Sequence, residues 1–504
     1  MAKETNISTA QELYNFLYKA CDIIRGPVSH ENFKDYITPL LYFKRLSDVY
    51  DEETAVALQE SGGDEEYAAF PEQHRFVIPD GCHWSDVRNR TENLGSAIVG
   101  AMRQIELANP QTLFGVLSIF GTSNWMNKTI LDDAKIRDLI EHFSSRKLGN
   151  NDYPAALMGD AYEILLKQFA DESKKKAGEF YTPRSVVRLL VRILDPQPGE
   201  SVYDPACGSG GMLIEAIRYM HNDSLCCGAI YGQEKNVTNA AIAKMNLFLH
   251  GASDFNVRQG DTLREPKILS GDHLARFHCV LANPPFSLEQ WGATEWKNDL
   301  YRRNLYGTPN DSNGDYAWIQ HMVASMKPVV GRMAVVLPQG VLFRGDTEQR
   351  IREKLIREDK IEAVITLGDK LFYGTGLSPC FLVLRAQKPT AHVNRILMVD
   401  GTKILTKRRA QNVLEESDVD RLYELYHNYR DEEDFARVVT NEDVLKKDCN
   451  LSPNRYIQYH QAERESYDEV LEQFKAAVER VNKAEAAYRK TQGGAVSRPH
   501  YMQQ

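Results

Sequence analysis

Residues 201–211, SVYDPACGSGG, place a short apolar strand directly before a glycine-rich turn, and a helical pattern follows over 212–219. Glycine allows a backbone to approach a ligand closely, and a helix N-terminus offers free N–H groups. The turn lacks the G-x-G-x-x-G spacing of dehydrogenases, and no Lys-Ser/Thr follows it as in a phosphate loop. Taken alone, the stretch therefore predicts either a structural turn or a cofactor-binding loop.

Acidic residues follow the next two predicted strands. Glu234 comes directly after the strand over 229–232, about 20 or more residues after the glycine-rich turn, where a carboxylate can accept both hydroxyls of a ribose. Asp261 follows a third strand and could meet an adenine amine. Each acid singly is typical of a solvated strand end, but their order behind the glycine-rich turn favours a nucleotide-like cofactor.

The decisive motif is Asn283-Pro284-Pro285-Phe286, which follows the apolar strand over 279–282. Two prolines stiffen the turn and remove two backbone donors, which leaves carbonyls free to accept hydrogen bonds. The Asn283 side-chain oxygen and the Pro284 carbonyl can then accept from one amino group, which makes its lone pair available for attack. Phe286 offers an apolar face on which a flipped base can stack. A purely structural origin of this motif, behind the other two, is the minor alternative.

Short apolar runs alternate with amphipathic stretches through the middle of the chain. The runs include SVYDPA, GAIYGQE, CVLANPP, MAVVLPQ and AVITLG, and a polar or Gly/Pro turn follows each of them. That alternation predicts an α/β fold with a doubly wound, Rossmann-like and mostly parallel sheet. Ligands of such sheets bind at the carboxyl ends of the strands, where the motifs above lie.

The two ends of the chain have helical patterns. Apolar residues recur at helical spacing over 13–24 and 33–41. A long amphipathic helix over 467–488 either packs on the chain's own body or docks a partner. We therefore predict a helical N-terminal domain at 1–150, a catalytic domain at 151–410 and a mostly helical, partner-docking extension at 411–504.

The net charge of −9 is unevenly distributed along the 504 residues. Residues 1–150 hold 15 basic and 22 acidic side chains, residues 151–400 hold 29 of each, and residues 401–504 hold 17 and 19. Contacts to DNA phosphates need clustered Lys and Arg, which an acidic chain supplies poorly. The equal numbers of basic and acidic side chains in residues 151–400 do not exclude a DNA substrate. We nevertheless expect a partner to supply most of the contacts that hold DNA.

Composition excludes several other classes. Hydrophobic residues make up 42% and charged residues 26%, which is typical of a soluble globular protein. No run of about 18 apolar residues occurs, and the polar N-terminus lacks the apolar core of a signal peptide. We expect a cytoplasmic protein without a membrane partner. The eight cysteines contain no C-x-x-C pair, so neither a metal site nor a disulfide scaffold is predicted.

The combined motifs resemble those of the S-adenosylmethionine-dependent amino-methyltransferases, and specifically the modification subunits of type I restriction-modification systems. The matching stretches are DYITPLLYFKRLSD (35–48), EFYTPR (179–184), DPACGSGG (204–211), GQE (232–234), GD (260–261), NPPF (283–286), NGDYAW (313–318), GRMAVVLPQGVLFRG (331–345) and LFYGTGLSPCFLVL (371–384). The resemblance covers about residues 5–400. It implies a methyltransferase domain that binds S-adenosylmethionine.

The resemblance also implies roles for individual residues. The segment that closes over the cofactor comprises Glu179, Phe180, Tyr181, Thr182, Pro183 and Arg184. The glycine-rich turn, Gly208, Ser209, Gly210 and Gly211, would line the methionine and ribose, with Asp204 near the cofactor's amino group. Glu234 would hold the ribose hydroxyls and Asp261 the cofactor adenine. Phe286 stands where many relatives have tyrosine, so stacking survives without a phenol hydroxyl.

The activity that the resemblance implies is methylation of the exocyclic N6 amine of a flipped adenine in double-stranded DNA. Asn283 and Pro284 would accept hydrogen bonds from the amine, Pro285 would stiffen the turn, and Phe286 would stack on the base. The mostly helical region 411–504 is short for an independent reader of DNA sequence. The family resolves this with a separate DNA specificity subunit and a translocating nuclease, the restriction subunit.

Three other functions remain as alternatives. The strongest is a solitary adenine DNA methyltransferase with its own recognition element. The Asn-Pro-Pro-aromatic turn also serves methyltransferases of protein glutamine and of RNA, which are usually shorter and lack the helical N-terminal domain. A catalytically silent scaffold is disfavoured by the intact glycine-rich turn and NPPF motif.

Basic and aromatic residues between Phe286 and Asp315 could order on DNA or form a mobile surface loop: Trp291, Trp296, Lys297, Arg302, Arg303 and Tyr306.

Overall fold

The computed structural model describes residues 7–110, 112–113, 115–116, 125–172, 182–220, 229–252, 254–372, 376–408, 411–460 and 467–491. The chain divides into two compact units, Met1–Ile457 and Gln458–Gln504. Within the described ranges, no helix is long and apolar enough to cross a membrane.

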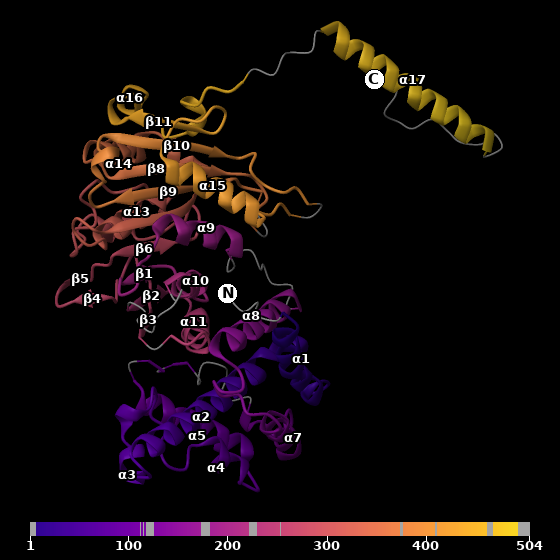
Figure 1. Ribbon diagram of the computed structural model, residues 1–504, viewed down its shortest axis with the longest axis vertical. Helices are drawn as coiled ribbons and strands as arrows, with labels where there is room; N and C mark the ends of the chain where they lie inside the picture. The colour runs from indigo at the N-terminus through magenta and orange to yellow at the C-terminus, as the bar shows by residue number, and fades with distance from the viewer. Residues whose placement is uncertain are drawn as a thin grey trace. The chain divides into compact units, whose positions relative to one another are not determined.

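A nine-stranded sheet organises the first unit (Figure 1). Its strands are β1 (Val202–Asp204), β2 (Ile230–Glu234), β3 (Phe255–Gln259), β6 (Cys279–Ala282), β7 (Arg332–Pro338), β8 (Ile361–Leu367), β9 (Pro379–Arg385), β10 (Arg395–Gly401) and β11 (Ala436–Thr440). They lie in the order β11-β10-β8-β9-β7-β6-β1-β2-β3. Only β9 and β11 run antiparallel to their neighbours in this sheet. The predicted doubly wound, mostly parallel α/β sheet is confirmed.

The central strands are buried on both faces, as their continuous apolar sequences require. Along β6, Cys279 and Leu281 belong to one apolar core, whereas Val280 and Ala282 belong to another on the opposite face. Successive side chains of a strand point to opposite faces, so one short run contributes to both cores. A two-stranded hairpin, β4 (Leu269–Ser270) with β5 (His273–Leu274), precedes β6.

Helix α9 (Arg184–Leu194) connects several parts of the first unit. Its apolar face is buried, while its arginines recur every four residues along the other side. Arg188 forms ion pairs with Glu215 of α10 (Gly211–Met220) and Glu416 of α15 (Glu416–Asn428). One turn further, Arg192 pairs with Asp420 of α15 at 2.6 Å. The helix that leads into the sheet is therefore fixed both to the next helix in the sequence and to a helix more than 200 positions later.

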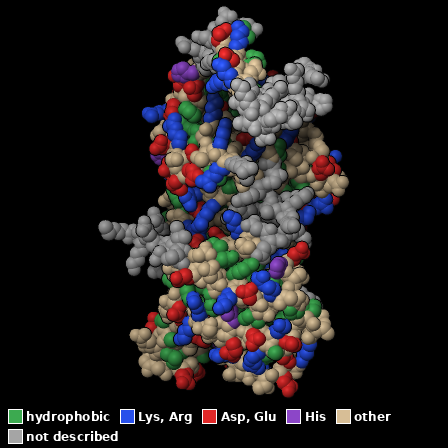
Figure 2. Space-filling view, turned by 90° about the vertical axis from the view of Figure 1, so that its right-hand side faces the viewer, with side chains coloured by type: hydrophobic (Ala, Val, Ile, Leu, Met, Phe, Trp, Pro, Cys, Tyr) green, Lys and Arg blue, Asp and Glu red, His purple; other side chains and the backbone are tan. Residues whose placement is uncertain are grey.

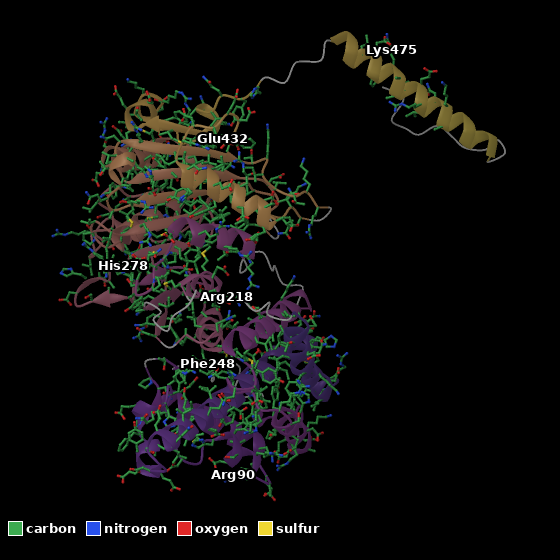
Figure 3. The ribbon with its side chains drawn as sticks, in the orientation of Figure 1. Arg90, Arg218, Phe248, His278, Glu432 and Lys475 are labelled. Carbon is green, nitrogen blue, oxygen red and sulfur yellow. The ribbon has the colours of Figure 1, made fainter. Side chains whose placement is uncertain are left out.

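The N-terminal part is helical, as predicted. Its helices are α1 (Ile7–Ile24), α2 (Lys34–Glu60), α3 (Glu65–Ala68), α4 (Trp84–Arg88), α5 (Leu94–Ala108), α7 (Asp133–Ser144) and α8 (Ala155–Glu172). Phe248 of α11 (Val237–Leu249) packs edge-on against Tyr42 and Phe76, with ring centroids 5.0 and 5.1 Å apart (Figure 3). The N-terminal helices and the sheet region thus share aromatic contacts.

The remaining α-helices that the structure describes in the first unit each come after a strand of the sheet in the sequence. They are α12 (Ala293–Trp296), α13 (Asp315–Ala324), α14 (Asp346–Arg357) and α16 (Asn441–Lys446). Strand β11 lies within the region predicted as mostly helical, and it pairs with β10. The domain boundaries at 150 and 410 stay predictions, although α15 and β11 both lie beyond residue 410 and contact the sheet region.

The second unit contains the predicted long helix, α17 (Tyr467–Thr491). Its apolar side chains Phe474, Val478 and Val481 are exposed by 65%, 40% and 53%. These three residues follow helical spacing and therefore lie on one face.

Candidate active site

Two predicted motifs meet where β1 and β6 lie side by side. The strands are parallel, with Val202 opposite Cys279 and Tyr203 opposite Val280. On its other side β1 pairs with β2, so the direction in which successive strands are added changes between β1 and β6. Such a switch point opens a crevice beyond the carboxyl ends of the strands. The glycine-rich turn follows β1 and the NPPF turn follows β6, so both lie at this edge.

The glycine-rich turn has a conformation that needs its glycines. Gly208 and Gly210 have φ values of +53° and +83°, in the left-handed region that side chains disfavour. The N–H of Gly210 donates to the Cys207 carbonyl at 2.7 Å and closes the turn. A Cβ added to Gly208 or Gly211 would meet no heavy atom within 4 Å. The space beside the turn is therefore open, as a ligand that approaches the backbone requires.

Asp204 and Glu234 place two carboxyl groups next to this turn. The Asp204 side chain is buried and accepts from the Ala206 N–H at 2.9 Å. Burial raises the pKa of the Asp204 carboxyl to about 8. Glu234 accepts from the Gly208 N–H at 3.0 Å and from the Asn236 N–H at 2.7 Å. Burial also raises the pKa of Glu234. A cationic ligand would relieve the cost of burying these acids.

Asp261 lies after β3 and is held in a turn of its own. Its Oδ1 accepts from the Leu263 N–H at 3.2 Å, and its Oδ2 pairs with Lys235 Nζ at 2.9 Å. The chain continues to Thr262, whose hydroxyl donates to the Pro205 carbonyl at 2.6 Å. This bond connects the loop after β3 directly to the DPACGSGG segment.

Asn283 has an unsatisfied acceptor in the NPPF turn. Its Nδ2 donates to Thr182 Oγ1 at 2.8 Å. Its Oδ1 is buried and accepts no hydrogen bond from any residue that the structure describes. Leaving a buried acceptor without a donor costs about 1–3 kcal/mol. A ligand N–H at this position would satisfy the oxygen.

The rest of the NPPF turn presents an aromatic ring. Pro284 is buried, Pro285 is exposed and Phe286 is half-buried. The Phe286 ring lies 6.1 Å from the ring of Phe372, tilted by 56°. Phe372 was part of the motif LFYGTGLSPCFLVL, but nothing in the sequence indicated that it supports Phe286.

The segment predicted to close over the cofactor is described in part. Glu179, Phe180 and Tyr181 lie outside the described residues. Thr182 contacts Asn283, and the carbonyl of Pro183 accepts from the N–H groups of Val186 and Val187 at the start of α9. Arg184 faces Asp160 and Glu163 of α8 at 3.5 and 3.8 Å. Arg218 of α10 also pairs with Asp160, at 2.6 Å (Figure 3).

The segment between Phe286 and Asp315 packs its tryptophans and Arg303 inside, which differs from the surface loop of one sequence hypothesis, while contact of the segment with DNA stays a prediction. Trp291 and Trp296 are each exposed by 2% and Arg303 by 3%, whereas Leu300 and Leu305 of the same segment are exposed. The guanidinium carbon of Arg303 lies 4.3 Å from the centroid of the Trp296 ring. The same group forms an ion pair with Asp299 at 2.6 Å and donates to the carbonyls of Thr262 and Leu263. Tyr306 is also buried. Only Lys297 and Arg302 of the six residues are exposed.

Tryptophans in a short polar segment could have indicated this small core, because large aromatic rings contribute most by burial. The partners of Arg303 could not have been found from the sequence. They are carbonyl oxygens about 40 positions away, in the loop after β3.

Comparisons with known proteins agree with this arrangement. The N-6 DNA Methylase family model matches residues 154–465, and the HsdM N-terminal domain model matches residues 13–143. The chain is 32% identical over 504 aligned positions to the type I restriction enzyme MjaVII methylase subunit of Methanocaldococcus jannaschii, covering 94% of this chain and 82% of that protein. The MjaVIII methylase subunit of the same organism is 30% identical, over 88% of this chain and 78% of the relative.

A solved structure has the same fold over most of its length. The type I restriction-modification methyltransferase subunit from Streptococcus thermophilus superimposes with a TM-score of 0.74 at 26% identity, covering 90% of this chain and all of the other. The chain belongs to the N-6 DNA methylase family. Within it, the relatives of this chain are the methylase subunits of type I restriction enzymes.

The packing of Arg303 predicts a difference between two adjacent arginines. Arg303→Ala should lower the free energy of unfolding by about 3 kcal/mol or more, because it leaves the buried Asp299 carboxylate without its partner. Arg302→Ala should leave stability within about 0.5 kcal/mol, as expected for an exposed side chain. Denaturant unfolding of both variants measures the difference. Equal stability of the two would contradict the buried arrangement.

Proposed function

We propose that this chain transfers a methyl group from S-adenosylmethionine to the N6 amine of a flipped adenine in double-stranded DNA. The observation that carries the proposal is the buried, unsatisfied Oδ1 of Asn283 at the crevice where the glycine-rich turn also lies. An exocyclic amine supplies the N–H donor that this oxygen needs. Membership of the N-6 DNA methylase family supports the same target atom.

The residues around the crevice fit the cofactor. The open space beside Gly208 and Gly211 would admit the methionine and ribose. Asp204 would face the cationic amino group, Glu234 the ribose hydroxyls and Asp261 the adenine. The cofactor supplies a methyl group on a sulfonium that is already activated for transfer. The protein therefore mainly has to align the amine with the methyl group and exclude water.

The NPPF turn would perform that alignment. Asn283 Oδ1 and the Pro284 carbonyl accept the two N–H groups of the amine and keep its lone pair directed at the methyl carbon. Phe286 stacks on the base after the base has left the duplex. With the cofactor bound, its sulfonium would supply the methyl group, and the methylated amine would release one proton to water while Asn283 and Pro284 hold it. No strong general base is required, because both acceptors increase electron density at the nitrogen.

We further propose that the chain acts as the modification subunit of a complex with a DNA specificity subunit and a restriction subunit. On the face drawn in Figure 2, Lys and Arg side chains lie among Asp and Glu side chains. The arginines of α9 are paired with carboxylates rather than available for phosphates. The exposed apolar face of α17, formed by Phe474, Val478 and Val481, is suited to a helical partner.

Replacing the proposed acceptor should separate chemistry from cofactor binding. Asn283→Ala should lower methyl transfer by at least about 100-fold, because the amine loses an acceptor in a water-excluded site. Cofactor affinity should stay near that of the parent chain. Transfer of labelled methyl groups to DNA and calorimetry with S-adenosylmethionine measure the two effects. Asn298→Ala, at an exposed asparagine, is the matched control. Loss of cofactor binding in Asn283→Ala would contradict the assigned role.

The raised pKa of Asp204 predicts a pH-dependent cofactor affinity. At pH values below about 8 the buried carboxyl is mostly protonated and must release its proton to bind a cation. Affinity should therefore rise with pH, by up to about tenfold per unit below pH 8, and level off above it. Calorimetry between about pH 6.5 and pH 7.5 tests this. Asp204→Asn should bind more weakly and remove the pH dependence. An unchanged slope in that variant would assign the titration to another group.

The partner proposal predicts that the purified chain methylates DNA poorly and without sequence choice. Adding its specificity subunit should produce site-specific methylation, which sequencing of modified adenines detects. Robust, site-specific methylation by the single chain would favour the solitary methyltransferase instead. In calorimetry with S-adenosylmethionine, Glu234→Ala is the control that lacks the proposed ribose-binding carboxylate. If the parent chain gives no heat either, the silent scaffold would be favoured.

A further inference from the structure

The NGDYAW motif at residues 313–318 lies outside the proposed cofactor and amine contacts, yet it folds directly against the NPPF turn. The side chain of Asn313 accepts from the Asp315 N–H at 3.0 Å, which forms a tight turn. The Gly314 N–H donates to the Leu288 carbonyl at 2.9 Å. A Cβ at Gly314 would lie 3.0 Å from the Trp291 ring. The motif is therefore packed closely against the segment that follows Phe286.

Asp315 makes the contact nearest to the NPPF turn. Its Oδ1 accepts from the Ser287 N–H at 2.8 Å, and its Oδ2 accepts from Arg344 at 2.5 Å. The side chain of Asp315 is completely buried. Arg344 in turn pairs with Glu348 of α14 at 2.8 Å. A chain of charged groups thus anchors the first peptide after Phe286 to α14.

The backbone at Ser287 explains why such an anchor is needed. Ser287 has a φ of +51°, in the left-handed region that costs energy for a residue with a side chain. Its N–H belongs to the peptide group that begins at the Phe286 carbonyl. A hydrogen bond to this N–H fixes both the ψ angle of Phe286 and the φ angle of Ser287. The course of the backbone directly after Phe286 is thereby fixed.

We propose that Asp315 is a positioning residue for the methyl-transfer reaction, which holds Phe286 in the orientation that stacks the target base. It acts by keeping Ser287 in its left-handed conformation, and Arg344 holds the Asp315 carboxylate for that purpose. The proposal rests on the function proposed above for Phe286. It gives the NGDYAW motif a role in presenting the base, separate from cofactor binding.

The kinetic test uses the full chain with its specificity subunit and DNA from a host that lacks the modification. Asp315→Ala should lower kcat for methyl transfer by about 100-fold, as expected for a misplaced reacting base. Affinity for S-adenosylmethionine should change by less than about twofold, because the glycine-rich turn is untouched. Asp311→Ala removes an exposed carboxylate from the same segment and should retain the parent rate. If Asp315→Ala does not fold, Asp315→Asn tests the Arg344 pair instead, because its amide oxygen can still accept from the Ser287 N–H, and it should lower kcat by less than Asp315→Ala.

A second substitution distinguishes positioning from general stability. Ser287→Gly keeps the N–H but removes the penalty of the left-handed conformation. Added to Asp315→Ala, it should restore kcat by about tenfold. Because Ser287→Gly also relieves strain in the fold, denaturant unfolding of the same variants is measured beside the kinetics, and a recovery of kcat that only follows a recovery of stability would indicate a purely structural role. Absence of recovery, or a parent-like rate for Asp315→Ala, would overturn the proposal.

A readout independent of methyl transfer separates this proposal from the proposed function. 4-Fluorophenylalanine introduced at position 286 should give one narrow ¹⁹F resonance in the parent chain and a broadened or split one in the Asp315 variants. An unchanged resonance would show that Asp315 does not position the ring. A changed resonance in a chain that transfers no methyl group to any DNA would refute the proposed function and leave the positioning contact established.

Discussion

The parallel pairing of β1 with β6 is the constraint on which the site depends. It brings together two turns that are more than seventy positions apart in the sequence, the glycine-rich turn after Asp204 and the NPPF turn after Ala282. Because chain connections diverge on either side of this pair, a crevice opens beyond the strand ends. A ligand on one turn and an amine on the other can therefore meet at a single crevice.

The elements around the crevice are held by contacts of unequal strength. The arginines of α9 reach α8, α10 and α15, but partly exposed ion pairs contribute only about 0–1 kcal/mol each. Burial of the apolar face of α9 contributes more, at about 1.5–3 kcal/mol for each large side chain. The ion pairs therefore mainly orient α9 relative to the neighbouring helices. Burial of its apolar face supplies most of the stability of its position. Thr182, just before α9, is positioned as a consequence.

Much of the fold and part of the site could be predicted from the sequence. Apolar runs and the turns after them located β1, β2, β6, β7 and β8, because parallel strands that are buried on both faces are nearly continuous runs of apolar residues. The partners of Asn283 and Ser287 could not be predicted, since Thr182 and Asp315 have no sequence pattern that relates them to the NPPF turn. The burial of Arg303 was not anticipated, because a basic residue among aromatic residues has the same sequence pattern whether it meets DNA or carbonyl oxygens.

The sequence by itself determined the class of fold, the order of the motifs and the chemical nature of the groups they carry. These properties are local: a strand, a turn and a glycine are specified by residues a few positions apart. Only the tertiary structure decided that Asn283 Nδ2 donates to Thr182 while its Oδ1 accepts from no residue that the structure describes, and that Asp315 holds Ser287 in the left-handed conformation. Such contacts join segments whose separation is set by packing, so they exist only once the sheet and its helices have assembled.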